Sequence, residues 1–297
     1  MGLDGFMFDA PPYYLALGLD DGENPLSGLH DNVISGYIRR VLVEPLHRVG
    51  AAAFGETYNL LRPSYNKMLD GGRNTDMADG VPGFPSKLHD IVVGGDASKL
   101  ERLLKETLDV MSGWSGGSVR IEADDRGNAT IASQKAAVTI LVGAYYVVRM
   151  GDPNCTSPLP SYPPYSHGDE WPGGCFGRWT GATDSVRRTL QAAHAHESLR
   201  PGTKRTVLVQ FTENNDRGVY AMLRGDDAVV VFNFSPRRVV ARIDPAISGV
   251  DTSQRTDDWI SGDPGPSVPE SGAWSIEVEA HGWRVLGLSK KVRDAST

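Results

Sequence analysis

The sequence predicts a parallel α/β region followed by a separate antiparallel β domain, and two observations carry this prediction. Short apolar runs alternate with helical patterns up to about Gly202, which is typical of parallel α/β architecture. Beyond that point the chain consists of short β-type runs separated by turn residues. We therefore expect two domains, residues 1–202 and residues 203–297.

The predicted strands of the first region are short, and several of them end in acidic residues. They are Gly5–Asp9, Ala51–Glu56, Met77–Val81, Ser118–Asp125 and Tyr145–Met150. The predicted helices are Asp31–Val43, Pro85–Val93, Ala97–Met111 and Gln134–Gly143. Pro45 is expected to end the first of these helices, because the residue before a proline is biased away from helical backbone angles.

The second region contains six predicted strands with turn residues between them. These are Thr206–Phe211, Val219–Arg224, Ala228–Asn233, Arg238–Ile243, Trp274–Glu279 and Trp283–Leu288. The long polar stretch from Ser248 to Gly272 is predicted to be a surface loop. No internal repeat is visible.

Charge and composition exclude several classes of function. The net charge of −7 gives no electrostatic footprint for nucleic acid and argues against an acidic membrane surface as partner. The first residues lack the pattern of a signal peptide. Cys155 and Cys175 could form a disulfide or stay as free thiols, and three glycosylation-type triplets hint at secretion. The compartment is therefore open: secreted if a signal peptide precedes the chain, otherwise cytoplasmic.

Three carboxylates stand at the ends of predicted parallel strands. In a parallel α/β barrel the active site lies at the carboxyl ends of the strands, where Asp9, Glu56 and Asp125 are expected. Such a trio suits glycoside hydrolysis, which needs a nucleophile, a proton donor and a group that supports a positively charged transition state. The alternative is structural, because acidic residues in these places also cap the helix that follows.

The segment Gly2-Leu-Asp-Gly-Phe-Met-Phe-Asp-Ala10 resembles the nucleophile motif G-x-D-G-F-R-x-D-A of the alpha-amylase family, glycoside hydrolase family 13. Phe54-Gly-Glu-Thr57 is similar to the family's general-acid motif, and Glu122-Ala-Asp-Asp125 stands where the family has N-H-D. Tyr145 to Asp152 resembles the last barrel strand, and Arg224 to Ser235 resembles the start of the C-terminal β domain. The resemblance covers most of the chain in the family's order.

The resemblance implies a partial (β/α)8 TIM barrel, strands four to eight, followed by an antiparallel β-sandwich domain. It implies retaining hydrolysis or transfer at α-glucosidic bonds, with an α-glucan or oligosaccharide as substrate. Asp9 would be the nucleophile, Glu56 the acid/base, Asp125 the transition-state stabiliser, and Asp124 a substrate-binding residue. It implies no certain cofactor and no metal ligand in this chain, although calcium can bind the full-length family fold.

Departures from the family pattern favour a rival interpretation, a non-catalytic relative that binds a carbohydrate or a partner protein. Met7 stands where the family has the arginine that keeps the nucleophile ionised. Ala123 and Asp124 replace Asn and His, and Asp124 adds a negative charge beside Asp125. Pro153 replaces a glutamate after the last strand.

The chain begins just before the strand that corresponds to the fourth of eight, so the front half of the barrel is expected to be missing. A half barrel would leave open sheet edges. A truncated chain is the first explanation, and a front half supplied by another chain is the second. A fragment without a function of its own would be poorly soluble and would unfold without cooperativity.

One further pattern concerns metals. His194, His196 and Glu197 could suggest a metal site, but residues two apart on a helix do not face each other. We expect a solvated helix end there instead.

Overall fold

The computed structural model describes residues 5–8, 39–57, 71–74, 84–106, 117–120, 129–143, 145–147, 181–200, 202–208, 217–245, 250 and 254–288. The chain divides into two compact units, residues 1–87 with 103–120, and residues 88–102 with 121–297. The expected domain boundary near residue 202 stays a prediction. None of the described helices is long and apolar enough to span a membrane.

The first unit contains four parallel strands that are neighbours in chain order. They are β1 (Gly5–Phe8), β2 (Ala52–Thr57), β3 (Gly71–Asn74) and β4 (Gly117–Arg120). Each pair of neighbours runs parallel, as the alternation of strand and helix predicts. The strand after β2 lies at Gly71–Asn74, whereas the predicted strand 77–81 falls outside the described residues.

A helical segment covers one face of β2. A π-helical turn, η1 (Arg39–Val43), leads into α3 (Glu44–Arg48). Val43 and Ala53 are buried together, with Leu46 packed against them. Pro45 does not end the helix here, so that prediction is wrong. Proline lies in the first turn of α3, where the missing N–H has no helical partner in any case.

The helix α5 (Phe84–Gly94) confirms one predicted helix, and α6 (Leu100–Leu104) confirms part of the predicted helix 97–111, of which residues 107–111 lie outside the described residues. Leu100, Leu103 and Leu104 are all buried, as the helical period predicts. A short 3-10 turn, η2 (Ala97–Lys99), links the two helices. The Asp96 side chain accepts a hydrogen bond from the Ser98 backbone N–H at 3.2 Å and so caps that turn.

The second unit holds a β-sandwich. Its larger sheet has the order β10-β12-β8-β7-β6, and β11 pairs with β9 in a separate small sheet. The strands are β6 (Arg205–Val207), β7 (Val219–Arg224), β8 (Ala228–Asn233), β9 (Val239–Ile243), β10 (Thr256–Asp258), β11 (Trp274–Val278) and β12 (Trp283–Leu288). All of these pairings are antiparallel, as the sequence predicts.

The core of the sandwich follows the strand alternation. In β9 and β11 every second residue is buried, and these residues join alternate residues of β7 and β8 in one apolar cluster. Trp274 is the largest fully buried side chain among the residues that the structure describes, and its indole Nε1 donates to the Pro266 carbonyl at 3.1 Å. Val219, Val231 and Ile276 belong to the same cluster.

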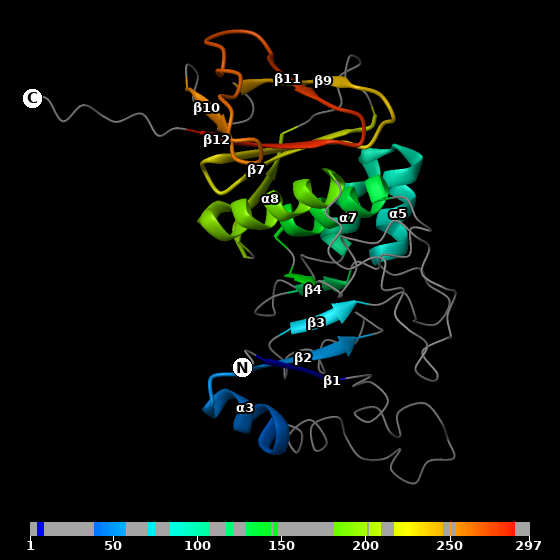
Figure 1. Cartoon of the computed structure of the whole chain (residues 1–297), viewed down its shortest axis with the longest axis vertical. Helices are drawn as coiled ribbons and strands as arrows, with labels where there is room; N and C mark the ends of the chain where they lie inside the picture. Colours follow the sequence, from blue (N-terminus) through cyan, green and yellow to red (C-terminus); the bar gives the residue numbers. More distant parts are fainter. Residues whose placement is uncertain are drawn as a thin grey trace, which may run out of the picture. The chain divides into compact units, whose positions relative to one another are not determined.

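Helices cover the outer face of the larger sheet, so that β7 and β8 are buried on both faces (Figure 1). α7 (Ala129–Leu141) and α8 (Gly181–Ala195) pack together through Ala136, Ile140 and Val186. The Gln134 amide donates to the Asn233 carbonyl at 2.6 Å, and the Trp283 indole donates to Thr189 at 2.9 Å. The unit therefore has three layers.

The predicted surface loop from Ser248 to Gly272 is wrong in part. It contains β10, and Thr256, Asp258 and Val268 are buried. The Asp258 carboxylate accepts from Arg284 at 2.7 Å and from the Ile260 backbone N–H at 2.9 Å, which fixes the turn after the strand. Polar composition pointed to the surface, but each of these polar groups is paired inside the fold.

Candidate active site at the ends of the parallel strands

Glu56 is the predicted catalytic residue that the structure describes, and it lies one residue before the end of β2. It is the register partner of Arg73 on β3, and Arg73 is in turn the partner of Ser118 on β4. These three residues form a row across three strands, at the carboxyl end of the sheet. This is the edge at which parallel α/β proteins place their active sites.

The row of Glu56, Arg73 and Ser118 lies on the face of the sheet opposite to the helical segment η1–α3. Successive residues of a strand lie on opposite faces. Ala53 lies on the face that η1 and α3 cover, where it is buried with Val43. Glu56 is three residues further along β2, and therefore belongs to the opposite face. By the parallel register, Arg73 and Ser118 share that face.

One residue before Glu56, Arg73 and Ser118 in their strands, and therefore on the helix-covered face, stands a row of glycines. Gly55, Gly72 and Gly117 are register partners across β2, β3 and β4. We call these three residues the glycine row. It has no Cβ atoms on three neighbouring strands, so another backbone or a ligand can approach the sheet closely there.

The other predicted site residues lie outside the described residues. Asp9 follows Phe8 in the chain, and Phe8 is the register partner of Gly55, the residue before Glu56. Asp124 and Asp125 follow β4, which ends at Arg120. Cys155 and Cys175 also lie outside the described residues, so their pairing stays open.

Arg73 is the residue of this row that sequence reasoning missed. It lies between Gly72 and Asn74, and glycine and asparagine are depleted in strands, so the local pattern favours a turn. Only the register places it beside Glu56.

The second unit has a buried polar cluster of a different kind. The Tyr220 hydroxyl donates to Glu101 at 2.6 Å, and Arg205 forms an ion pair with the same carboxylate at 3.6 Å. Burial, reinforced by the hydrogen bond to Glu101, raises the pKa of Tyr220 far above its usual range. The cluster ties the start of α6 to β7 and β6, so its role is structural.

Arg224 is fully buried and binds three backbone carbonyl oxygens. Its guanidinium donates to Val142 at 3.1 Å, to Thr203 at 2.9 Å and to Arg200 at 2.8 Å. Burial, with a smaller contribution from the charge of Arg205, lowers the pKa of Arg224 to about 10. Gly143 adopts a positive φ of 88°, and a Cβ atom there would lie 2.5 Å from the Arg224 Nη2 atom. Arg224 on β7 therefore connects the β domain to the residues that follow α7.

The histidines that resemble a metal motif do not form a metal site with other described residues. Among those residues, no three His, Cys, Asp or Glu side chains gather closely enough to hold a metal ion. His194 lies in the last turn of α8 and is exposed, as predicted. His196 differs, because it stacks on Trp259 with ring centroids 3.5 Å apart. Burial there lowers the pKa of His196, which favours the neutral ring.

No model of a known protein family matches the sequence, and no curated protein sequence does so either. Solved structures, in contrast, match the fold. An alpha-amylase from H. orenii is 13% identical with a TM-score of 0.66, and covers 97% of this chain and 61% of its own. A noncanonic maltogenic alpha-amylase from Thermotoga neapolitana is 17% identical with a TM-score of 0.65. The match covers 97% of this chain and 61% of the amylase.

A debranching enzyme from Nostoc punctiforme, soaked with acarbose, matches with 12% identity and a TM-score of 0.61, over 96% of this chain and 57% of its own. The chain thus spans about three fifths of the length of these solved enzymes. The likeness runs through both compact units, because almost the whole chain is aligned. The chain therefore shares its fold with alpha-amylase-type enzymes of glycoside hydrolase family 13, and the resemblance that its motifs predict is confirmed at the level of the fold.

Proposed function

We propose that the chain is the back part of a (β/α)8 glycosidase barrel with its C-terminal β domain, and that it acts on α-glucosidic bonds. In this proposal β1 to β4 correspond to barrel strands four to seven. The reaction is retaining hydrolysis or transfer by double displacement. Asp9 attacks the anomeric carbon, Glu56 protonates the leaving oxygen and then activates water, and Asp125 supports the transition state, with Asp124 at the sugar.

The parallel register at the end of β2 carries the proposal. Glu56 lies next to the point where β1 leads into Asp9, because Phe8 is paired with Gly55. Neighbouring strands lie about 4.7–4.9 Å apart. A retaining glycosidase needs its two carboxyl groups about 5–5.5 Å apart. This strand spacing is compatible with the separation that the double-displacement mechanism requires.

The substrate class follows from the solved relatives and from the carboxylates together. One matching protein, AmyP, was solved in complex with maltose, and another was soaked with acarbose. We propose an α-glucan or a shorter α-glucoside as the substrate of this chain.

The proposal is tested with the full chain and two substrates that differ in their leaving groups. Glu56→Gln should lower the hydrolysis of an α-glucan by about a hundred- to ten-thousandfold, because the sugar leaving group needs a proton. The first step with α-glucosyl fluoride should be affected far less, because fluoride leaves without a general acid. Equal losses with both substrates would contradict the role of Glu56, and an unmodified chain without activity on either would contradict the enzyme.

A specific observation favours the second candidate, a non-catalytic relative that binds carbohydrate. Met7 lies in β1 in register with Phe54, so the position that bears the family arginine holds a thioether. A thioether cannot stabilise an ionised nucleophile. This candidate predicts that maltooligosaccharides bind the chain without turnover, and that Glu56→Gln leaves their affinity unchanged.

A further inference from the structure

His196 is the first residue after α8, and its imidazole ring contacts the β domain. The His196 backbone N–H donates to the Ala192 carbonyl at 3.0 Å, so the residue stays attached to the end of the helix. Its ring stacks on the Trp259 indole, with the ring centroids 3.5 Å apart and the ring planes 3° apart. Because Trp259 directly follows β10, the stack joins the end of α8 to the β10–β12 edge of the larger sheet.

Trp259 is held in place by β12 at two points. Its backbone N–H donates to the Val285 carbonyl at 2.8 Å. Its indole ring lies against Gly287, where an added Cβ atom would come within 2.1 Å of the ring. Since the backbone of β12 supports the indole, we expect a change of charge on His196 to move the segment that follows α8 rather than Trp259.

That segment also contacts the turn between β7 and β8. The Gly225 backbone N–H donates to the Lys204 carbonyl at 2.9 Å. Asp227 belongs to the same turn, and its buried Oδ1 atom accepts no hydrogen bond from the described part of the chain. The negative charge of Asp227 acts on the His196 ring and favours its protonated form. His196 therefore lies between an aromatic face and an acidic turn.

Opposing effects decide the protonation state of His196. Burial of the ring removes water from the charged form, and it keeps the pKa of His196 below its ordinary value against the attraction of Asp227. The face of Trp259 also attracts a cation. The other charged groups of the surrounding segments are exposed or paired with each other. They are His194, Glu197, Arg200, Lys204, Asp226, Asp257, Asp258 and Arg284.

We propose that the stack of His196 on Trp259 is a pH-sensitive contact, which holds the segment after α8 on the β domain while the imidazole is neutral and weakens when the imidazole is protonated in mild acid. A histidine with a depressed pKa in the folded state contributes stability that is fully present above its unfolded pKa of about 6.5. This contribution is lost as pH falls through the folded value. The inference concerns the second unit and is independent of the proposed glycosidase activity.

The direct test is a proton NMR titration of the imidazole rings in the full, unmodified chain. The His196 signal is identified by its nuclear Overhauser contact with the indole ring 3.5 Å away, so no variant is needed. Its midpoint should lie below about pH 6.5, and the signal of the same indole should shift with the same midpoint. A midpoint at or above this value, or an indole signal that does not follow it, would overturn the proposal.

A second test measures the effect on stability with a matched pair of variants. His196→Gln removes the titrating ring, and His194→Gln makes the same substitution at an exposed position two residues earlier. Between pH 7 and pH 5 the melting temperature should fall more in the unmodified chain and in His194→Gln than in His196→Gln. Equal falls in all three proteins would contradict the proposal.

Asp227→Asn tests the acidic side of the contact. The variant removes the charge that favours the imidazolium, so the midpoint of His196 should move to lower pH than in the unmodified chain. The same titration measures this shift. An unchanged or higher midpoint in the folded variant would show that the Asp227 charge does not act on the ring, and would contradict the arrangement on which the proposal rests.

Discussion

The parallel sheet and the larger antiparallel sheet differ in the composition of their strands. β7 and β8 are buried at every residue and contain Val229, Val230, Val231 and Phe232 in succession. β2, β3 and β4 instead carry the glycine row, with Glu56 and Arg73 at the next register position. Side chains that bury apolar surface stabilise a sheet, whereas glycine weakens it. The comparison indicates that the antiparallel region supplies stability, whereas the parallel region carries the residues of the proposed active site.

The largest effect on stability is expected in the core of the β-sandwich unit. Phe232→Ala removes a fully buried aromatic side chain and should lower the free energy of unfolding by about 3–5 kcal/mol. Val240→Ala, on an exposed position of β9, is the control and should change it by less than about 0.5 kcal/mol. Urea denaturation measures both. Equal effects would mean that burial in this unit does not determine its stability.

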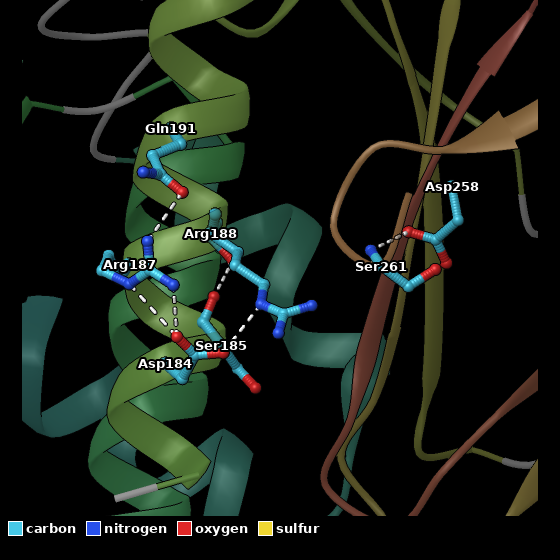
Figure 2. Close-up of polar contacts among 8 residues, drawn as sticks. Asp184, Ser185, Arg187, Arg188, Gln191, Asp258 and Ser261 are labelled. Atoms are coloured by element: carbon cyan, nitrogen blue, oxygen red, sulfur yellow. Dashed lines mark hydrogen bonds and ion pairs between the residues drawn. The ribbon is translucent and has the colours of Figure 1, made fainter. Parts of the chain in front are cut away.

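A smaller loss is expected when Arg224 is replaced by methionine. Three backbone carbonyl oxygens would lose a donor inside the fold, at a cost of about 2–4 kcal/mol. Arg187→Met is the matched control, since Arg187 lies on the exposed side of α8 and bonds to Asp184 and Gln191 (Figure 2). Thermal melting at low and high salt compares the two. Only the loss at Arg187 should depend on salt.

The smallest effect on stability is expected at Asp184, which accepts from Arg187 at 2.5 Å and from Arg188 at 2.7 Å on the surface of α8 (Figure 2). Mainly through the hydrogen bond from Arg187, the pKa of Asp184 is held below its ordinary value. A carboxyl group with a depressed pKa stabilises the fold above its ordinary value and loses this effect as pH falls through the folded value. The difference in melting temperature between Asp184→Asn and the unmodified chain should be small at pH 7 and vanish in acid.

The variant Met7→Arg tests whether the parallel region is catalytic. Met7→Arg restores a guanidinium on β1, and activity on α-glucans should rise, by up to about a hundred- to thousandfold if one preorganised donor was missing. The melting temperature should hardly change. No change in activity, in a variant that melts cooperatively, would count against an enzyme whose single defect is Met7 and would favour the carbohydrate-binding candidate.

The β-sandwich was the more predictable region. The bounds of β7, β8 and β12 agree with the sequence prediction. Turn residues such as Gly225 on either side of an apolar run determine where each strand begins and ends. α8 escaped prediction, since Asp184, Arg187 and Arg188 resemble a solvated segment while only a narrow stripe from Val186 packs on α7. So narrow an apolar stripe does not predict a packed helix until the position of its partner, α7, is known.

In the parallel region, the sequence predicted a strand that ends at Glu56, and the structure places Glu56 one residue before the end of β2. It did not predict Arg73 as its neighbour. β2 and β3 are separated by residues 58–70, and the register of two such strands depends on pairing that no local pattern encodes. Local patterns thus predict elements and the residues at their ends, whereas the juxtaposition of two charges on different strands needs the fold.

The glycine row has a consequence for the exchange of backbone amide hydrogens with water. The three glycines contribute no side chains of their own to cover the hydrogen-bond ladder of β2, β3 and β4 at this row. Amides at such places exchange through small local openings, whereas amides buried on both faces exchange only when the whole unit unfolds. We therefore expect the amides around Glu56 to exchange long before those of β8, so that the backbone at the proposed active site can adjust locally without unfolding of the whole unit.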